Sequence, residues 1–413
     1  MVVSALRRTS AGPAEAGRHV PVGGPYITAA TRILAVLFGI GALAIVWRLI
    51  VGLGATTALN DGYPMGLWIA FDVVTGTALA CGGYAVAILL YVLNKGRYHP
   101  LIRPAILTSA LGYSLAGLSV FLDIGRWWLV WKVPIFFWHW NFNSALLEVA
   151  LCIMAYVVVL WIEISPAFLE KFQDSSLLLL RQISRRALPL LERASIWIVA
   201  LGLLLPTMHQ SSLGTLMLLA DSRLHALWRT PLLPLLFLLT CVSMGYAMVV
   251  FESAFASVAF KRKPEIAMLA SLAWAIVPVQ LLVLALRIGD LAWRGNLDLL
   301  FAGGGRAGLA LIELALFLAP AVMLARRRSR SDLGGLVRAA MVMMAGGALY
   351  RFDTYLVAFM PGAHWSYFPS VPELFITIGL VSAEILAYVL IVRTFPILAS
   401  GTAGLKARTT PER

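Results

Sequence analysis

The chain of 413 residues is 60% hydrophobic and 13% charged, with a mean hydropathy of +0.85. A soluble domain carries about 25% charged residues, so this composition excludes a soluble globular protein. The formal net charge is +13, but the basic residues stand in short gaps between apolar runs. That placement excludes a nucleic-acid-binding surface and is typical of a membrane protein.

Ten apolar runs, each long enough to cross a bilayer at 1.5 Å of helical rise per residue, follow a polar N-terminal segment. Residues 1–30 are predicted to be a disordered tail, and residues 399–413 a second tail. The chain is therefore predicted to be an all-α, polytopic membrane protein with one transmembrane domain over residues 31–398. The predicted spans are 31–53, 66–93, 101–123, 144–164, 194–212, 232–256, 266–288, 307–325, 336–359 and 373–397.

The basic residues between the spans predict the orientation. The two tails and the connections on their side of the membrane hold 24 Lys and Arg, whereas the other connections hold 6. Because Lys and Arg are enriched in cytoplasmic loops, both termini are predicted to be cytoplasmic and the membrane to be the bacterial inner membrane.

Two connections carry further signals. The cytoplasmic segment 166–192 combines a Leu run with basic residues and predicts an amphipathic helix on the membrane surface. The outer loop 125–141 contains Trp127, Trp128, Trp131, Trp138 and Trp140. An aromatic belt at the headgroups and a docking surface for a partner explain these residues equally well.

Ionisable side chains within the spans are costly and usually face the interior of a helix bundle. Some are expected to be structural: Arg351 and Asp353 form a predicted local pair, and Arg48 is predicted to reach outward to the interface. The full set is Asp72, Glu148, Glu252, Glu313, Asp353, Glu384, Arg48, Arg287 and Arg351.

The depths of these groups predict a site. Counted from the span ends, Asp72, Glu148 and His209 lie within about 10 Å of the outer surface, and Glu313 shares that depth. Tyr113 lies mid-span, and Glu252 and Glu163 lie towards the cytoplasm. An outer site for a polar ligand head is therefore expected between the second, fourth and fifth spans. Buried carboxyls able to exchange protons would supply a route inward.

Histidine and cysteine placement argues against resident cofactors. A b-type haem in a helical bundle generally needs two inward-facing histidines, and of the six histidines only His209 is predicted inside a span. The three cysteines show no C-x-x-C spacing, so no iron–sulfur cluster or structural metal is expected.

Several long strings resemble one family. They are NDGYPMGLWIAFDVVTGTALACGGYA, YVLNKGRYHPLIRPA, LGYSLAGLSVFLDIGRWW, NSALLEVALC, LLPTMHQSSLG, VVFESA, YLVAFMPGAHWSYFP and EILAYVLIVRTFPIL. They are similar to the polysulfide-reductase (NrfD) type of membrane subunit, especially the branch that serves periplasm-facing [NiFe]-hydrogenases. The resemblance extends from about residue 32 to residue 398.

The resemblance implies a core of two four-helix bundles, without haem, that exchanges electrons between a quinone and iron–sulfur clusters of periplasmic partners. Menaquinone and ubiquinone both remain open. The partners implied are a ferredoxin-like subunit and the small and large [NiFe]-hydrogenase subunits. Its proton-transfer residues fall on Tyr113, Glu148, His209 and Glu252, and Asp72 is added as a partner for the quinone head together with His209 and Glu148.

Other functions fit the same residues. A related subunit of a molybdenum reductase for polysulfide, dimethyl sulfoxide or tetrathionate would share the strings above. A proton-coupled secondary transporter would also bury carboxyls, but the internal repeats common in transporters are not visible. A simple membrane anchor would need no buried carboxyls. By itself the chain is not expected to oxidise hydrogen.

Overall fold

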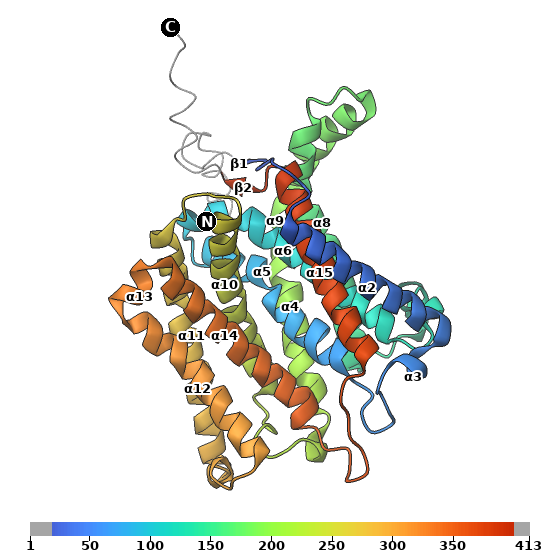
Figure 1. Ribbon diagram of the computed structural model, residues 1–413, viewed down its shortest axis with the longest axis vertical. Helices are drawn as coiled ribbons and strands as arrows, with labels where there is room; N and C mark the ends of the chain where they lie inside the picture. Colours follow the sequence, from blue (N-terminus) through green and yellow to red (C-terminus); the bar gives the residue numbers. More distant parts are fainter. Residues whose placement is uncertain (1–18, 400–413) are drawn as a thin grey trace.

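The computed structural model describes residues 19–399, so most of the predicted N-terminal tail and the residues after 399 lie outside the described part. Within it, ten helical segments are long and apolar enough to cross a membrane, which confirms the all-α, multi-pass prediction (Figure 1). Seven spans are single helices: the first is α2 (Ala29–Val51), the fourth to eighth are α8 (Ala145–Phe172), α9 (Leu178–Leu218), α10 (Leu233–Ala259), α11 (Ile266–Trp293) and α12 (Gly305–Ala325), and the tenth is α15 (Val371–Thr394). The second span consists of η1 (Trp68–Thr75), α4 (Gly76–Leu79), α5 (Gly82–Ala87) and η2 (Ile88–Val92). The third consists of η3 (Gly96–Leu101) and α6 (Ile102–Asp123), and the ninth of α14 (Leu333–Phe352) and η8 (Asp353–Val357).

Short elements join the spans. They are α3 (Leu53–Thr56), η4 (Trp127–Leu129), α7 (Lys132–Ile135), η5 (Phe137–His139), η6 (Asp221–Arg223), η7 (Asp298–Leu300) and α13 (Arg327–Ser331). The strands β1 (His19–Val20) and β2 (Leu398–Ala399) pair antiparallel, with His19 opposite Ala399. This terminal clasp, formed by β1 and β2, holds both described ends on one face of the molecule, here called the termini face. The end that carries α3 and α7 is the opposite face.

The central spans form two closed rings of four. Spans two to five pack in sequence through α5, α6, α8 and α9, and α9 returns to α5. Spans six to nine close in the same way through α10, α11, α12 and α14. The two four-helix bundles implied by the family resemblance are therefore present, and α10 joins them by packing on both α5 and α9.

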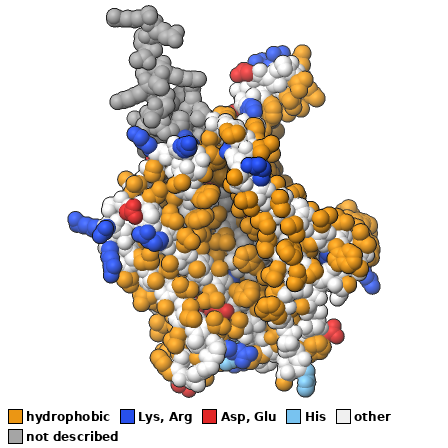
Figure 2. Space-filling model, viewed as in Figure 1, with side chains coloured by type: hydrophobic (Ala, Val, Ile, Leu, Met, Phe, Trp, Pro, Cys, Tyr) orange, Lys and Arg blue, Asp and Glu red, His pale blue; other side chains and the backbone are white. Residues whose placement is uncertain are grey.

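The first and last spans stand outside these bundles. Helix α2 packs along α15, and the two backbones approach so closely that a Cβ added at Gly41 would lie 2.5 Å from the Cα of Gly379. Apolar side chains cover the flanks of the spans, and Lys and Arg gather towards the termini face (Figure 2). That surface is the one expected for contact with lipid.

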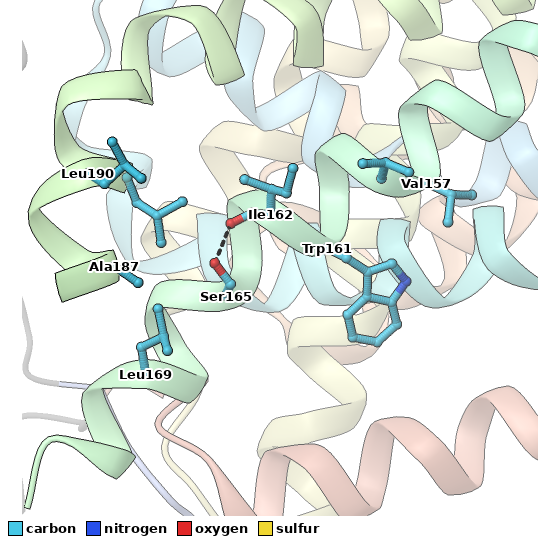
Figure 3. A pocket seen from close by; sticks show the side chains of 9 residues that line it. Val157, Trp161, Ile162, Ser165, Leu169, Ala187 and Leu190 are labelled. Atoms are coloured by element: carbon cyan, nitrogen blue, oxygen red, sulfur yellow. Dashed lines mark hydrogen bonds between the residues drawn. The ribbon is translucent and has the colours of Figure 1, made fainter. Parts of the chain in front are cut away.

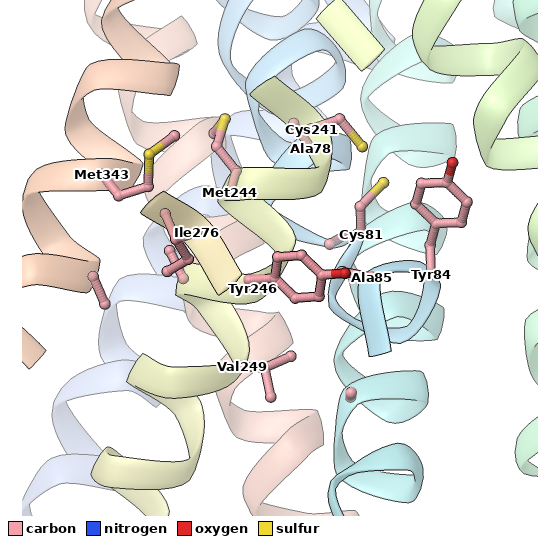
Figure 4. Packing of buried hydrophobic residues seen from close by; sticks show 14 of the residues in the cluster. Ala78, Cys81, Tyr84, Ala85, Cys241, Met244, Tyr246, Val249, Ile276 and Met343 are labelled. Carbon is pink, nitrogen blue, oxygen red and sulfur yellow. The ribbon is translucent and has the colours of Figure 1, made fainter. Parts of the chain in front are cut away.

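The second span is irregular. It begins as the π-helix η1, breaks after α4, and ends as the π-helix η2. The break lies against α10, where a Cβ at Gly245 would be 2.5 Å from the carbonyl oxygen of Cys81, and Figure 4 shows Cys81 and Cys241 at this junction. Since π-helices are frequent at functional sites, η1 is a candidate position for such a site.

The prediction of an amphipathic surface helix at 166–192 is wrong. Helix α8 continues to Phe172 and α9 begins at Leu178, so the segment forms the tip and sides of a helical hairpin that projects from the termini face (Figure 1). The apolar and basic residues follow a helical spacing that simply extends the two spans. The predicted tail was also too long, because His19–Val20 forms β1 and α2 begins at Ala29.

Candidate functional site

Asp72 lies in the π-helix η1 with 2% of its surface exposed. Its Oδ2 accepts hydrogen bonds from Ser119 Oγ of α6 at 3.2 Å and from Thr377 Oγ1 of α15 at 3.1 Å. Its Oδ1 is buried and has no partner among the described residues. The carboxyl therefore faces the third and tenth spans and has one oxygen free for a further donor.

A second carboxyl belongs to Glu384 of α15, which faces α6. A Cβ at Gly112 of α6 would lie 3.3 Å from Glu384 Oε1 and only 2.6 Å from the Cβ of Ala80. Gly112 therefore allows the second span to pack closely on α6, with Glu384 beside the contact. Along α15, Glu384 lies between Thr377, which donates to Asp72, and Tyr388, which donates to Glu252.

The third carboxyl, Glu252 of α10, accepts a hydrogen bond from Tyr388 Oη of α15 at 2.6 Å, and Thr108 of α6 lies beside it. Along α15 the contributing residues Thr377, Glu384 and Tyr388 are seven and four residues apart, which places them on one helix face. We call Asp72, Glu384 and Glu252 the carboxyl line.

The carboxyl line has an opening at the termini face. A cleft of about 90 Å³ there has Glu252 and Tyr388 in its lining, together with Ser253, Arg262, Glu265 and several apolar residues. Glu252 therefore stands at the inner end of a path from the surface, whereas Asp72 lies near the opposite face.

Tyr113 and His209 form a separate buried cluster inside the first bundle. Both are fully buried, and Tyr113 Oη lies 3.4 Å from His209 Nδ1. Gln210 Nε2 donates to Thr77 Oγ1 at 3.0 Å and to Tyr113 Oη at 3.3 Å. His209 Nε2 and Gln210 Oε1 have no partner among the described residues, so the cluster can both accept and donate one further hydrogen bond.

Glu148 does not lie where the sequence predicted. It is exposed, in the first turn of α8 after the N-cap Ser144, because the helix begins only at Ala145. Between described residues, no hydrogen bond or ion pair joins it to Asp72 or His209. The expected burial of Glu148 is therefore wrong, and the predicted convergence of these three side chains between the second, fourth and fifth spans stays a prediction. A carboxylate in this first turn is stabilised by the helix N-terminus.

The buried arginines also differ from expectation. Arg48 is fully buried and donates from Nε to the carbonyl of Leu122 at 2.7 Å and from Nη2 to that of Ile124 at 2.8 Å. Arg351 donates to the carbonyls of Val74 and Phe237 and not to Asp353. Arg48 therefore caps the end of α6 instead of reaching outward, and Arg351 joins η1 to α10.

The sequence missed several contributors to the carboxyl line. Glu384 was recognised as ionisable but received no role, and Ser119, Thr377 and Tyr388 were not singled out. The one available signal was the spacing of Thr377, Glu384 and Tyr388 on one face of the last span. The partners on α6 could not be found without knowing that α6 and α15 pack together.

Two further features bear on ligands. Within residues 19–399 no group of three or more His, Cys, Asp or Glu could hold a metal ion. A shallow apolar groove of about 490 Å³ lies between α8 and α9 near the hairpin, lined by Trp161, Ile162 and Leu190 among others (Figure 3). None of the residues that line it belongs to the carboxyl line or to the Tyr113–His209 cluster.

Comparison with known proteins gives a consistent result. The family model described as polysulphide reductase, NrfD, matches residues 57–353. The chain is 41% identical to a protein of Escherichia coli K12 named as a probable Ni/Fe-hydrogenase 2 b-type cytochrome subunit, over 92% of this chain and 94% of the relative. A protein of Nitratidesulfovibrio vulgaris Hildenborough is 32% identical over 92% of this chain and 97% of its own length. The integral membrane subunit of a menaquinone reductase from the same organism is 36% identical over 43% of this chain and 41% of its own length.

Proposed function

The chain belongs to the polysulphide reductase (NrfD) family, and on that premise we propose that it is the quinone-reducing membrane subunit of a respiratory [NiFe]-hydrogenase complex. The name of the 41% identical relative supports hydrogenase subunits as partners. The menaquinone reductase relative supports a quinone as the electron acceptor. The partners are the small and large hydrogenase subunits and a ferredoxin-like iron–sulfur subunit.

The termini face is the cytoplasmic side of the inner membrane, and the opposite face is periplasmic. The excess of Lys and Arg in the connections of the termini face supports this orientation. The iron–sulfur partner docks on the periplasmic side. Trp128, Trp131 and Trp138 of that side are each about half exposed or more, which supports a contact surface there, since Trp is enriched at interfaces.

The reaction adds two electrons and two protons to a quinone, giving the quinol. Electrons arrive from the partner's cluster at the periplasmic side, and protons arrive from the cytoplasm through the carboxyl line. The observation that carries this proposal is the carboxyl line itself, which begins at the cleft of the termini face and ends at the free oxygen of Asp72. Reduction makes the quinone oxygens basic, so a proton donor within hydrogen-bonding reach is required.

The predicted residues take distinct parts in this scheme. Asp72 donates a proton to the quinone head, and Glu252 receives protons from the cleft. Tyr113 and His209 orient the quinone head by hydrogen bonding on a side other than that of Asp72. The unpartnered Nε2 of His209 supports this role. Glu148 is exposed at the periplasmic end of α8 and takes no part in this route.

The chain is predicted to bind no haem, although a relative is named a b-type cytochrome subunit. His99 lies at the cytoplasmic end of the third span, and Tyr113 lies about 20 Å further along the same span at the usual helical rise. His209 contacts Tyr113 and is therefore far from His99. Two histidines so far apart cannot share one iron. The absorption spectrum of the dithionite-reduced complex should lack b-type bands, and bands in stoichiometric amount would refute this prediction.

Asp72→Asn and His209→Ala in the purified complex test the proposed function. Asn keeps the hydrogen bonds of Ser119 and Thr377 but cannot carry a proton. We expect hydrogen-to-quinone turnover to fall by about 10²-fold or more, as for the loss of a general acid. Hydrogen-dependent reduction of an artificial dye should be unchanged, because it uses only the metal centres of the partners.

Glu192→Gln is the matched control, because Glu192 is an exposed carboxylate of the hairpin away from the carboxyl line. It should retain both activities. Full quinone activity in Asp72→Asn, or failure of any hydrogenase subunit to copurify with the wild-type chain, would refute the proposal.

A further inference from the structure

The apolar groove between α8 and α9 lies outside the proposed proton route and has no part in it. Its volume is about 490 Å³, within the range of small-molecule sites. One wall is fixed by Trp161, which donates from Nε1 to Ser114 Oγ of α6 at 2.9 Å. Around it the lining comes from both helices of the hairpin (Figure 3) and includes Val157, Ile162 and Leu169 of α8 and Ala187 and Leu190 of α9.

The groove lies at the edge of the apolar layer of the membrane. The apolar run of the fourth span ends near Ile164, and that of the fifth begins near Ala194. On α8 the lining residues, 157–169, cross from the apolar run into the charged segment, and on α9 the lining residues, 187–191, lie just within that segment. A ligand with an apolar body and a charged head matches this boundary.

Two arginines of α9, Arg186 and Arg193, stand beside the groove. They are four and three residues from the lining residue Leu190, and residues at these spacings are neighbours on a helix surface. Both are exposed, and neither takes part in an ion pair between described residues. These rim arginines, Arg186 and Arg193, are therefore available to an anion at the edge of the groove.

The acidic residues in the hairpin half of α8 do not neutralise the rim arginines. Glu163 is directed to Gly202 of α9, where an added Cβ would lie 3.5 Å from Glu163 Oε2, and Gly202 is nine residues beyond the nearer rim arginine. Glu170 pairs with Arg103 of α6, with Oε1 2.5 Å from Nη2. Asp174 lies in the turn after the end of α8.

The other charged residues of α9 near the hairpin lie on different sides of the helix. Residues 178–193 hold four arginines and one glutamate. Arg181, Arg185 and Glu192 are nine, five and two residues from Leu190, spacings that turn them away from the groove. The charge next to the groove on α9 is therefore that of the rim arginines, which favours an anionic ligand.

We propose that the groove binds an anionic phospholipid of the surrounding membrane, with one acyl chain against Trp161 and Ile162 and the phosphate at the rim arginines. Guanidinium groups donate two parallel hydrogen bonds to phosphate oxygens, and basic pockets between membrane helices bind anionic lipid head groups. A quinone tail would fit the apolar wall but would make no use of the arginines. No residue of the groove belongs to the carboxyl line, so the site is independent of the proposed quinone chemistry.

Native mass spectrometry of the full chain, purified and delipidated in detergent, tests the site. Dioleoyl phosphatidylglycerol is the anionic probe, and dioleoyl phosphatidylethanolamine has the same chains without net charge. We expect the first phosphatidylglycerol to bind more tightly than phosphatidylethanolamine. Arg186→Gln combined with Arg193→Gln should weaken that first binding event by about 10-fold or more and abolish the preference between the two lipids.

Arg181→Gln combined with Arg185→Gln removes the same charge from other sides of the same helix and should bind phosphatidylglycerol like the wild-type chain. Ala187→Phe fills the groove and should weaken the binding of both lipids. The proposal is overturned if the two arginine pairs lose affinity equally, or if the rim variant keeps full affinity.

Equal affinity of the wild-type chain for the two lipids would also overturn the proposal, as would unchanged binding by a folded Ala187→Phe variant. Retention of a quinone by the wild-type chain in place of added phosphatidylglycerol would assign the groove to the quinone tail instead. Where Ala187→Phe fails to fold, the two arginine pairs decide the question, since their side chains lie on the surface of α9.

Discussion

At the scale of single residues, exposure separates Glu148 from the other acidic groups of the spans. Asp72, Glu313 and Asp353 are enclosed by neighbouring helices, whereas Glu148 emerges from the first turn of α8. Depth along a span can be counted from a sequence, but the side of the helix that meets the bundle cannot. The same limit explains why Arg48 was expected to reach outward although it is fully buried.

Glu148→Gln is predicted to leave most hydrogen-to-quinone turnover intact, because the exposed Glu148 lies outside the carboxyl line that delivers the protons. Glu148→Asp should behave in the same way. Assembly is checked by native gel and turnover by hydrogen-dependent quinone reduction. Because Glu148 stabilises the first turn of α8, the Gln variant should unfold slightly earlier, and a large loss of turnover in an assembled complex would contradict this prediction.

At the scale of elements, the irregular second span depends on close backbone contact with α10. Arg351 donates to the carbonyl of Val74 in η1, so a π-helical carbonyl finds a donor from another span. Gly245 lets α10 approach Cys81 at the break. Sequence patterns gave no indication of this irregularity, because π-helical backbone is stabilised by packing partners that are distant in the chain.

Gly245→Ala is therefore predicted to destabilise the protein by about 1–3 kcal/mol, the usual cost of overpacking. The added Cβ would lie 2.5 Å from a carbonyl oxygen that cannot move without shifting the second span. Gly289→Ala is the matched control, since Gly289 is also helical but has nothing within 4 Å of an added Cβ. It should be neutral or stabilising by about 0.5–1 kcal/mol. Thermal unfolding in detergent measures both, and equal stability of the two variants would contradict the close contact.

At the scale of the whole molecule, the ten spans, their order and the all-α class were predictable from apolar run length alone. The two bundles came from the family resemblance and not from any pattern in the residues. The hairpin of α8 and α9 and the terminal clasp were not predicted. A helix can continue past the membrane, and a two-residue strand depends on a partner almost four hundred residues away.

The terminal clasp is predicted to loosen in acid. Burial, helped by the positive charges of Arg103 and Arg262, lowers the pKa of His19 from 6.5 to about 3. Because the closed clasp binds the proton less readily than the open one, its stability is constant above pH 6.5 and falls as the pH drops below that value. Hydrogen–deuterium exchange, corrected for intrinsic rate, should show residues 392–399 losing protection between pH 7.5 and about 5.5.

His19→Gln removes the titrating group, so the corrected exchange of the same segment should no longer change over this pH range. Peptides from α10 serve as the internal control and should stay protected in both proteins. Identical pH profiles for the wild-type and variant segments would show that His19 does not govern the clasp.

The packing of α2 on α15 has a consequence for how the protein is made. Helix α2 leaves the ribosome before the other nine described spans, and α15, which packs along it, leaves after them. During most of synthesis α2 must therefore remain in lipid without the contact at Gly41 and Gly379. Its mean hydropathy is 2.4, and only 11% of its most apolar stretch is buried in the folded protein, so α2 is stable in contact with lipid. Arg48 is the exception, and its carbonyl acceptors at the end of α6 arrive as soon as the third span is inserted.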